Sequence, residues 1–183
     1  MAKVVEIGPF LKSRSPQSKS KPRKSAPRPR QARSSLRVAL VLETPDTRPS
    51  LKRWLDVELK RIAAIAGVTA GSIALLLVAD ARMCELHGEY KDDPTTTDVL
   101  TFDLRESPDE AIEGDLVLCI DEAARQAKER GHDTRTELLL YAVHGLLHLM
   151  GYDDLRAADF EKMHAKEDEL FEAAGYGPVF KKR

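Results

Sequence analysis

Apolar and polar residues follow two different periods along the chain, and these periods predict helices and strands. Between Leu51 and Ala66 apolar residues recur three or four positions apart, the spacing of one face of an α-helix. This spacing predicts a helix over about residues 50–66. The apolar run over 72–79 is short and continuous, as in a buried strand, and glycines at 67 and 71 place a turn before it.

The rest of the chain divides in the same way. Apolar and β-branched runs predict strands over 37–42, 99–104 and 115–120, with loops over 88–98 and 107–114. Helical spacing predicts helices over about 80–87, 121–130, 134–150 and 155–174. The last of these presents Phe160, Met163, Leu170 and Phe171 on one face. The order β-α-β-α-β-β-α-α-α predicts an α+β domain, or an α/β domain, with a mixed sheet flanked by helices.

Capping residues mark the ends of several predicted helices. Thr134 and Glu137 have the spacing of a capping box at the start of the helix over 134–150. Asp121 can cap the helix over 121–130. From residue 138 to 143 the next helix is apolar on almost every side, so we expect it to be central and buried. Gly151 is expected to end it.

One segment has the length of a membrane span. Residues 62–79 contain no charged side chain, and 18 residues is about the length at which a spanning helix becomes possible. Gly67, Thr69, Gly71 and Ser72 interrupt the middle of the run, however. We therefore interpret it as the end of one helix, a turn and a buried strand, and expect no membrane partner.

The near-neutral total charge conceals an uneven distribution. The 183 residues contain 29 Lys and Arg against 30 Asp and Glu. Residues 1–35 hold ten basic residues and one acidic residue, a net charge of +9, whereas residues 36–183 carry −10. Five prolines and seven serines in residues 1–35 predict a disordered basic tail, followed by one folded domain over 36–183.

The role of this tail is open on sequence grounds. A basic arm for nucleic acid is the favoured interpretation, with a solubilising extension as the alternative. An organelle transit peptide is less favoured, because prolines disrupt the amphipathic helix that such leaders form. Cys84 and Cys119 make no disulfide framework and no C-x-x-C pair, which indicates a reducing compartment and a cytoplasmic location.

The residues from His144 to Asp154 predict a metal site. Two histidines four positions apart on a helix lie on one face, one turn apart, so both can reach one ion. A reversal at Gly151 can return Asp154 to the same ion as a third ligand. Three protein ligands leave the fourth tetrahedral position to water, which is typical of a catalytic zinc.

Other interpretations of these residues remain. His144 and His148 alone could be buried core histidines, but the glycine and the carboxylate after them favour metal binding. Asp153 is expected to support the site or cap the turn, although two adjacent carboxylates leave the choice of ligand open. His164 could approach from the last helix, but a surface or packing histidine is the favoured interpretation. The H-E-x-x-H signature of zinc peptidases has a glutamate where this chain has Gly145, so a peptidase is disfavoured.

These residues also carry a family resemblance. The segment from His144 to Asp154 closely resembles the signature H-G-x-L-H-L-x-G-Y-D-H of the YbeY family. Two further segments, 97–102 and 114–119, resemble that family's T-D-V-L-S-F and G-D-I-V-I blocks in the same order. The resemblance extends over about residues 37–178.

The resemblance implies a zinc-dependent endoribonuclease that acts on single-stranded RNA and has a small mixed sheet flanked by helices. It implies a role in maturing the 3′ end of small-subunit ribosomal RNA and in ribosome quality control, with the small ribosomal subunit and assembly factors as partners. The ligands of the one zinc ion would be His144, His148 and, in place of a third histidine, Asp154.

Two residues depart from the family pattern. Asp154 replaces a neutral imidazole with a carboxylate, which lowers the charge of a zinc site from +2 to +1. Lys91 stands where the family usually has an arginine. Lysine keeps the positive charge that would bind a phosphate in catalysis, but it cannot make the two parallel hydrogen bonds of an arginine. The alternative interpretation of Lys91 is a solvated loop lysine. A non-catalytic ribosome-assembly factor with a stabilising zinc is therefore the competing function.

Overall fold

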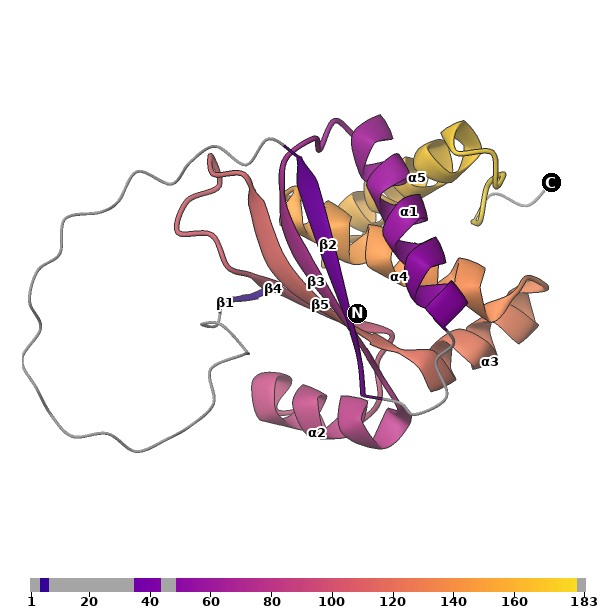
Figure 1. The fold of residues 1–183 in the computed structure, drawn as a ribbon. Helices are drawn as coiled ribbons and strands as arrows, with labels where there is room; N and C mark the ends of the chain where they lie inside the picture. Colours follow the sequence, from indigo (N-terminus) through magenta and orange to yellow (C-terminus); the bar gives the residue numbers. More distant parts are fainter. Residues whose placement is uncertain (1–3, 7–34, 44–48, 181–183) are drawn as a thin grey trace, which may run out of the picture.

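The computed structural model describes residues 4–6, 35–43 and 49–180, which form one mixed sheet and five helices (Figure 1). The strands are β1 (Val4–Glu6), β2 (Leu36–Leu42), β3 (Gly71–Val78), β4 (Val99–Asp103) and β5 (Ile112–Cys119). The helices are α1 (Pro49–Ile65), α2 (Asp80–Lys91), α3 (Ile120–Arg130), α4 (Thr134–Leu149) and α5 (Ala157–Ala173).

The sheet has the strand order β1-β4-β5-β3-β2. Strands β2, β3 and β5 are parallel, and β4 joins β5 in the antiparallel direction through a short connection. The helix α1 connects β2 to β3, as a parallel pair requires. The mixed sheet confirms the predicted fold class, and the predicted element order is confirmed from residue 36 onward.

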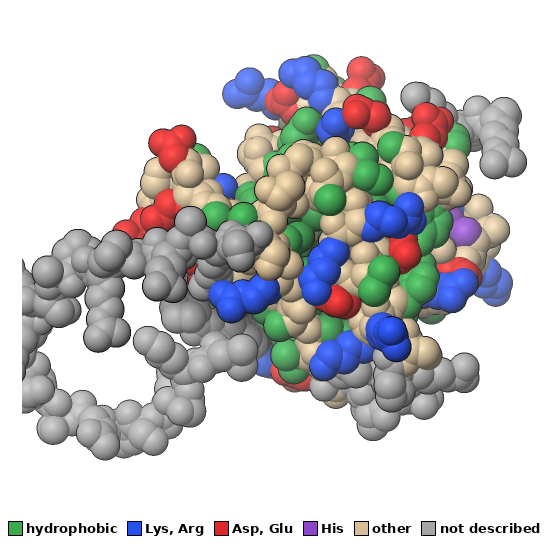
Figure 2. Space-filling view, turned by 45° about the horizontal axis from the view of Figure 1, so that its top comes forward, with side chains coloured by type: hydrophobic (Ala, Val, Ile, Leu, Met, Phe, Trp, Pro, Cys, Tyr) green, Lys and Arg blue, Asp and Glu red, His purple; other side chains and the backbone are tan. Residues whose placement is uncertain are grey.

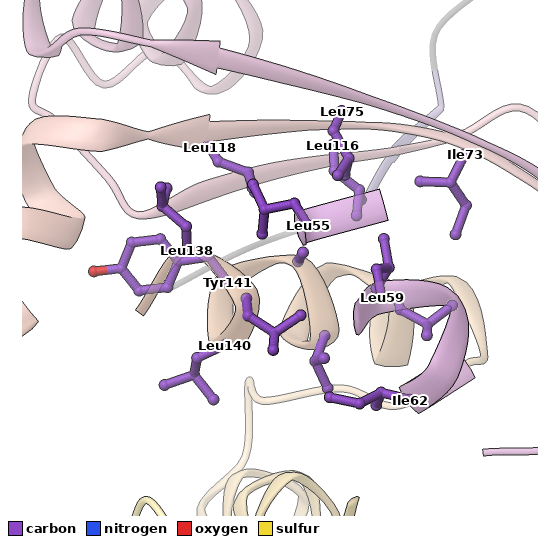
Figure 3. Packing of buried hydrophobic residues seen from close by; sticks show 14 of the residues in the cluster. Leu55, Leu59, Ile62, Ile73, Leu75, Leu116, Leu118, Leu138, Leu140 and Tyr141 are labelled. Carbon is purple, nitrogen blue, oxygen red and sulfur yellow. The ribbon is translucent and has the colours of Figure 1, made fainter. Parts of the chain in front are cut away.

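The two faces of the sheet bury different side chains. On β5, Leu116 and Leu118 face the helices α1 and α4, and Figure 3 shows them opposite Leu55 and Leu138. The alternate residues Val117 and Cys119 pack on the other face against α2. The helix α4 is buried from Glu137 to Leu149. The prediction of a central buried helix is therefore confirmed.

The backbone of α4 lies against the sheet at Gly145. A Cβ atom added there would lie 2.7 Å from Leu116 Cδ2 and 3.0 Å from Thr101 Oγ1, both on buried side chains. The first contact is shorter than Cβ atoms make in folded proteins and the second is tighter than most, so a side chain at this position would displace its neighbours. A glutamate of the peptidase type has no space at residue 145.

Two predicted caps are wrong. The N-cap of α4 is Asp133, one residue before the predicted Thr134, and its carboxylate accepts the backbone N–H of Thr136 at 2.8 Å. Aspartate caps well because its short side chain reaches the second or third free amide. The N-cap of α3 is Cys119, which makes no capping bond, while Asp121 accepts the backbone N–H of Asp80 at 2.9 Å.

Several predicted boundaries also shift. The helix α2 continues to Lys91 and ends at Asp92, which has a left-handed φ of 57°, so part of the predicted loop over 88–98 is helical. The strand β5 begins at Ile112 because it pairs along its whole length with β3, a partner that sequence spacing does not reveal. The prediction that Phe160 belongs to the packing face of α5 is wrong, since 42% of this residue is exposed.

The segment over 1–35 is only partly described. Residues 4–6 form β1, which pairs in parallel with β4 from Val4 opposite Thr101 to Glu6 opposite Asp103, so the prediction of disorder is wrong for these three residues. Apart from Ser35, the rest of the predicted tail lies outside the described residues. None of the described helices has both the length and the apolar composition needed to cross a bilayer.

The close contact at Gly145 predicts opposite effects of one substitution in two helices. Gly145→Ala should lower the free energy of unfolding by about 1–2 kcal/mol, because overpacking outweighs the gain in helix propensity. Gly88→Ala in α2 should raise it by roughly 0.5–1 kcal/mol, because its nearest neighbour, Pro94, lies at an ordinary 3.6 Å. Urea unfolding of both variants measures the difference. Stabilisation by both would contradict the close packing of α4 on the sheet.

Candidate metal centre

Three buried side chains converge at the C-terminal end of α4. His144 Nε2 lies 3.2 Å from His148 Nε2 and 3.8 Å from Asp154 Oδ2. One ligand atom from each residue lies within 4.8 Å of the others, and no more than 9% of any of the three residues is exposed. The structure therefore brings together all three predicted ligands.

The chain reversal after α4 places the carboxylate. Gly151 has a left-handed φ of 92°, its N–H donates to the carbonyl of His148 at 2.9 Å, and the N–H of Tyr152 donates to that of Leu147 at 3.0 Å. This pair of bonds is the Schellman motif, which turns the chain back across the helix end. Asp153 supports the turn, since it accepts the backbone N–H of Asp154 at 2.8 Å.

Each histidine is oriented by a bond to its other ring nitrogen. His144 Nδ1 lies 2.8 Å from Glu167 Oε1, and His148 Nδ1 lies 3.0 Å from the carbonyl oxygen of Tyr152. Because both partners are acceptors, we assign the ring protons to the Nδ1 atoms. Both Nε2 atoms then present lone pairs to the same point, as metal-binding histidines do.

The donor set fits a cation. Asp154 Oδ1 is buried and has no hydrogen-bond partner among the described residues. Two imidazole lone pairs 3.2 Å apart also repel each other unless a proton or a metal ion lies near them. A cation bound by two nitrogens and one carboxylate would satisfy all three groups, and this combination is typical of zinc and other transition metals.

Burial and neighbouring charges move the two histidine pKa values apart. Burial alone lowers the pKa of His144, but its hydrogen bond to Glu167 and the nearby carboxylates outweigh this effect, so the pKa is raised. Burial and the charge of His144 lower the pKa of His148. Without a metal, the pair is expected to hold its proton on His144. A metal ion must displace that proton, so its affinity should fall as the pH is lowered.

Glu167 is a site residue that the sequence analysis missed. It is fully buried, and its second oxygen accepts from His164 Nδ1 at 2.6 Å. Burial raises its pKa, but the bonds to His144 and His164 bring it below the usual value. His164 therefore holds the supporting carboxylate and is absent from the ligand set. Glu167 lies 13 residues beyond Asp154 on another helix, so no spacing in the sequence connects it with the site.

The metal centre opens into a cleft. The cleft has a volume of about 480 Å³ and is lined by Asp98, Arg130, Leu140, Tyr141, His144, Asp154, Phe160, His164, Glu167 and Phe180. A second cleft of about 360 Å³ is lined by Thr96, Thr97, Asp98, Glu122, Gln126, Arg130 and Tyr141. The two share three residues and are therefore neighbours. His144 and Asp154 line only the larger cleft, so a substrate bound there would lie beside the candidate metal site.

Lys91 is not among the described residues that line these two clefts. It is the last residue of α2, on the opposite face of the sheet from α4, and is half-buried. Asp98, in the loop after α2, lines both clefts. The phosphate-binding role of Lys91 stays a prediction.

Known proteins resemble this chain over most of the folded region. A family model described as Endoribonuclease YbeY matches residues 40–175, which include all three candidate ligands. A protein of that name from Anaeromyxobacter sp. is 40% identical over 139 residues, 75% of this chain and 72% of its own length. Another from Bacillus cereus is 30% identical over 154 residues, 78% of this chain and 99% of its own length.

A solved structure resembles the fold. The solution structure of TM1509 from Thermotoga maritima has 25% sequence identity to this chain and a TM-score of 0.53. The match covers 79% of this chain and 96% of that one.

Loss of the carboxylate behind His144 should weaken metal binding. Glu167→Gln is expected to lower the affinity for a divalent metal about 10- to 100-fold, because the neutral amide no longer favours the proton on Nδ1. Competition against a chromophoric chelator measures the affinity of each variant for the metal ion. Glu169→Gln is the matched control, since Glu169 lies on the same helix and pairs with the surface residue Lys166. Equal affinities for the two variants would contradict the orienting role of Glu167.

Proposed function

Because the chain belongs to the YbeY family of endoribonucleases, we propose that it cuts single-stranded RNA with one zinc ion held by His144, His148 and Asp154. The observation that carries this proposal is the three-ligand site, which is oriented from behind by Glu167 and open to a cleft in front. A closed structural zinc site has four protein ligands, whereas a catalytic site keeps one position free.

Zinc in such a site supplies an activated water molecule and a Lewis-acid contact to a phosphoryl oxygen. The chain's own residues prepare the site. Glu167 fixes the ring of His144 with its Nε2 lone pair toward the cleft, and the carbonyl of Tyr152 does the same for His148. Asp154 adds one negative charge and lowers the net charge of the site. Lys91 is proposed to bind a phosphate of the RNA and to stabilise negative charge that develops during cleavage.

The proposed substrate is ribosomal RNA. The family resemblance supports maturation of the 3′ end of the small-subunit RNA and a part in ribosome quality control, with the small subunit and its assembly factors as partners. A cytoplasmic location follows from the same proposal. The two cysteines support it, because both are free thiols in the structure.

The charge of the chain bears on how RNA is attracted. Residues 36–183 carry −10, and the face in Figure 2 mixes Lys and Arg with Asp and Glu. Neutralisation of phosphates supplies much of the affinity of proteins for nucleic acid, so an acidic domain binds RNA weakly by charge alone. We propose that the basic residues of 1–35 supply this attraction and that the cleft supplies the chemistry.

A non-catalytic ribosome-assembly factor with a stabilising zinc is the second candidate. The carboxylate at Asp154 and the lysine at Lys91 favour it, because both depart from the family's pattern. A stabilising ion would leave the cleft without activity. A cleavage assay separates the two functions.

Cleavage of single-stranded RNA is expected to depend on the three ligands. The purified zinc-loaded chain should cut a labelled single-stranded RNA, and His144→Ala, Asp154→Ala and addition of a chelator should each reduce the rate by at least about 100-fold. Lys91→Ala should cut more slowly while it binds zinc normally. Metal analysis accompanies each assay.

Two results would contradict the proposal. Activity that survives both ligand substitutions would indicate a contaminating nuclease or a different site. A wild-type chain that binds zinc and the RNA but does not cut it would favour the assembly factor.

The carboxylate ligand predicts an alkaline activity profile. Asp154→His should retain zinc and move the pH profile of cleavage to lower pH, because a neutral third ligand leaves more positive charge to favour loss of a proton from water. Asp159→His makes the same change at a surface position on α5 and should leave the profile in place. An unchanged or alkaline-shifted profile for Asp154→His would contradict the charge argument.

A further inference from the structure

Three aromatic side chains line one wall of the larger cleft. The ring centroid of Phe160 lies 4.0 Å from that of His164, with the planes at 84°. The ring of His164 lies 3.8 Å from that of Phe180, tilted by 33°. These contacts join α5 to the segment that follows it, and they hold the three rings as one unit beside Glu167 and His144.

Phe160 is the accessible member of this wall. It lies on the same helix as Phe171, which is fully buried in the core, yet 42% of Phe160 is exposed. Its side chain contributes little to the core and lines the cleft. The anchoring of Phe180 supports the wall, because Asp168 Oδ1 accepts the backbone N–H groups of Val179 at 2.6 Å and Phe180 at 2.8 Å. The wall is therefore a supported aromatic surface that faces solvent inside the cleft.

A cation lies next to the wall. The guanidinium of Arg130 is 5.2 Å from the ring centroid of Phe180, and 32% of its side chain is exposed. One of its nitrogens donates to the buried Glu137 at 2.7 Å, which fixes the side chain where the two clefts meet. A guanidinium has five N–H donors, so others remain for a ligand.

An aromatic surface, a fixed guanidinium and a metal site in one cleft match the chemistry of a nucleotide. Bases of single-stranded RNA stack on Phe and His rings, and phosphates pair with Arg. The volume of about 480 Å³ lies in the range of pockets that enclose a small organic ligand. An apolar peptide would use the rings but would leave the guanidinium and the metal site without a partner.

We propose that Phe160 stacks on one base of the RNA and that Arg130 binds a neighbouring phosphate, so that together they hold one nucleotide beside the metal centre. This proposal rests on the proposed function, since it specifies how the same cleft grips its RNA. Base stacking on a phenylalanine tolerates any base. The subsite therefore contributes affinity and position more than sequence preference.

The binding experiment uses the zinc-loaded full chain and a short 2′-O-methyl RNA that contains 2-aminopurine, whose fluorescence falls when its base stacks. The RNA is recovered after each titration to verify that it is intact. Phe160→Ala should weaken binding about 5- to 100-fold, as loss of one base stack does, and should abolish the quenching on saturation. Phe160→Leu keeps the apolar bulk and should still lose the quenching. Ile65→Ala is the control, because Ile65 is also 42% exposed but lies on α1 away from the clefts.

The phosphate contact is tested through the salt dependence of binding. Arg130→Gln alone would remove one of the two partners of the buried Glu137, which also pairs with His132. The double variant Arg130→Gln/Glu137→Gln is therefore used, which keeps the net charge of the chain. The slope of log affinity against log salt should fall by about 0.7, the value for one phosphate contact on a single strand. An unchanged slope in a folded double variant would overturn this part of the proposal.

The outcomes separate the subsite from the proposed function. If Phe160→Ala binds the probe as tightly as the wild type and quenches it equally, the proposed subsite is overturned, whether or not the chain cuts RNA. A wild-type chain that neither binds the probe nor cuts RNA would overturn the proposed function itself. Binding and quenching that depend on Phe160 would support the subsite, and they are measured without any cleavage step.

Discussion

The close approach of α4 to the sheet at Gly145 is the constraint on which the site depends. Without a side chain there, the helix lies directly on Leu116 and Thr101, and its next turn carries His148 into a buried position. The left-handed residue Gly151 then returns the chain across the helix end and brings Asp154 to the same point. Packing in the core thus sets where the metal ligands lie, because a rigid helix transmits its position to both histidines.

The site is completed by a second layer of charge from α5. Glu167 is buried between His144 and His164, and this arrangement satisfies a carboxylate that would otherwise be costly to bury. The same helix then exposes Phe160 at the cleft. One helix therefore supports the metal site from behind and supplies the wall that faces a substrate.

Charge is distributed unevenly along the chain. The region after residue 35 is acidic, and its described cations mostly pair with nearby acids, as Arg125 does with Asp80 and Arg105 does with Asp103. Arg130 differs, because its partner Glu137 is buried while part of the guanidinium faces the cleft. In the proposed function, such a domain contacts RNA at its cleft, and long-range attraction falls to the basic residues before it.

The sequence by itself determined the order of the elements from residue 36 onward, the mixed sheet and the central helix, and it predicted the three residues that meet at the candidate metal site, because each of these follows from local periodicity or spacing. It misplaced the caps at Thr134 and Asp121. In the folded chain the carboxylate of Asp133 takes a free amide of α4, and that of Asp121 accepts the backbone N–H of Asp80 in another helix. Tertiary structure alone decided the role of Glu167 and the exposure of Phe160. Both depend on how α5 packs across α4, and side chains from separate helices meet through packing that no spacing along the chain encodes.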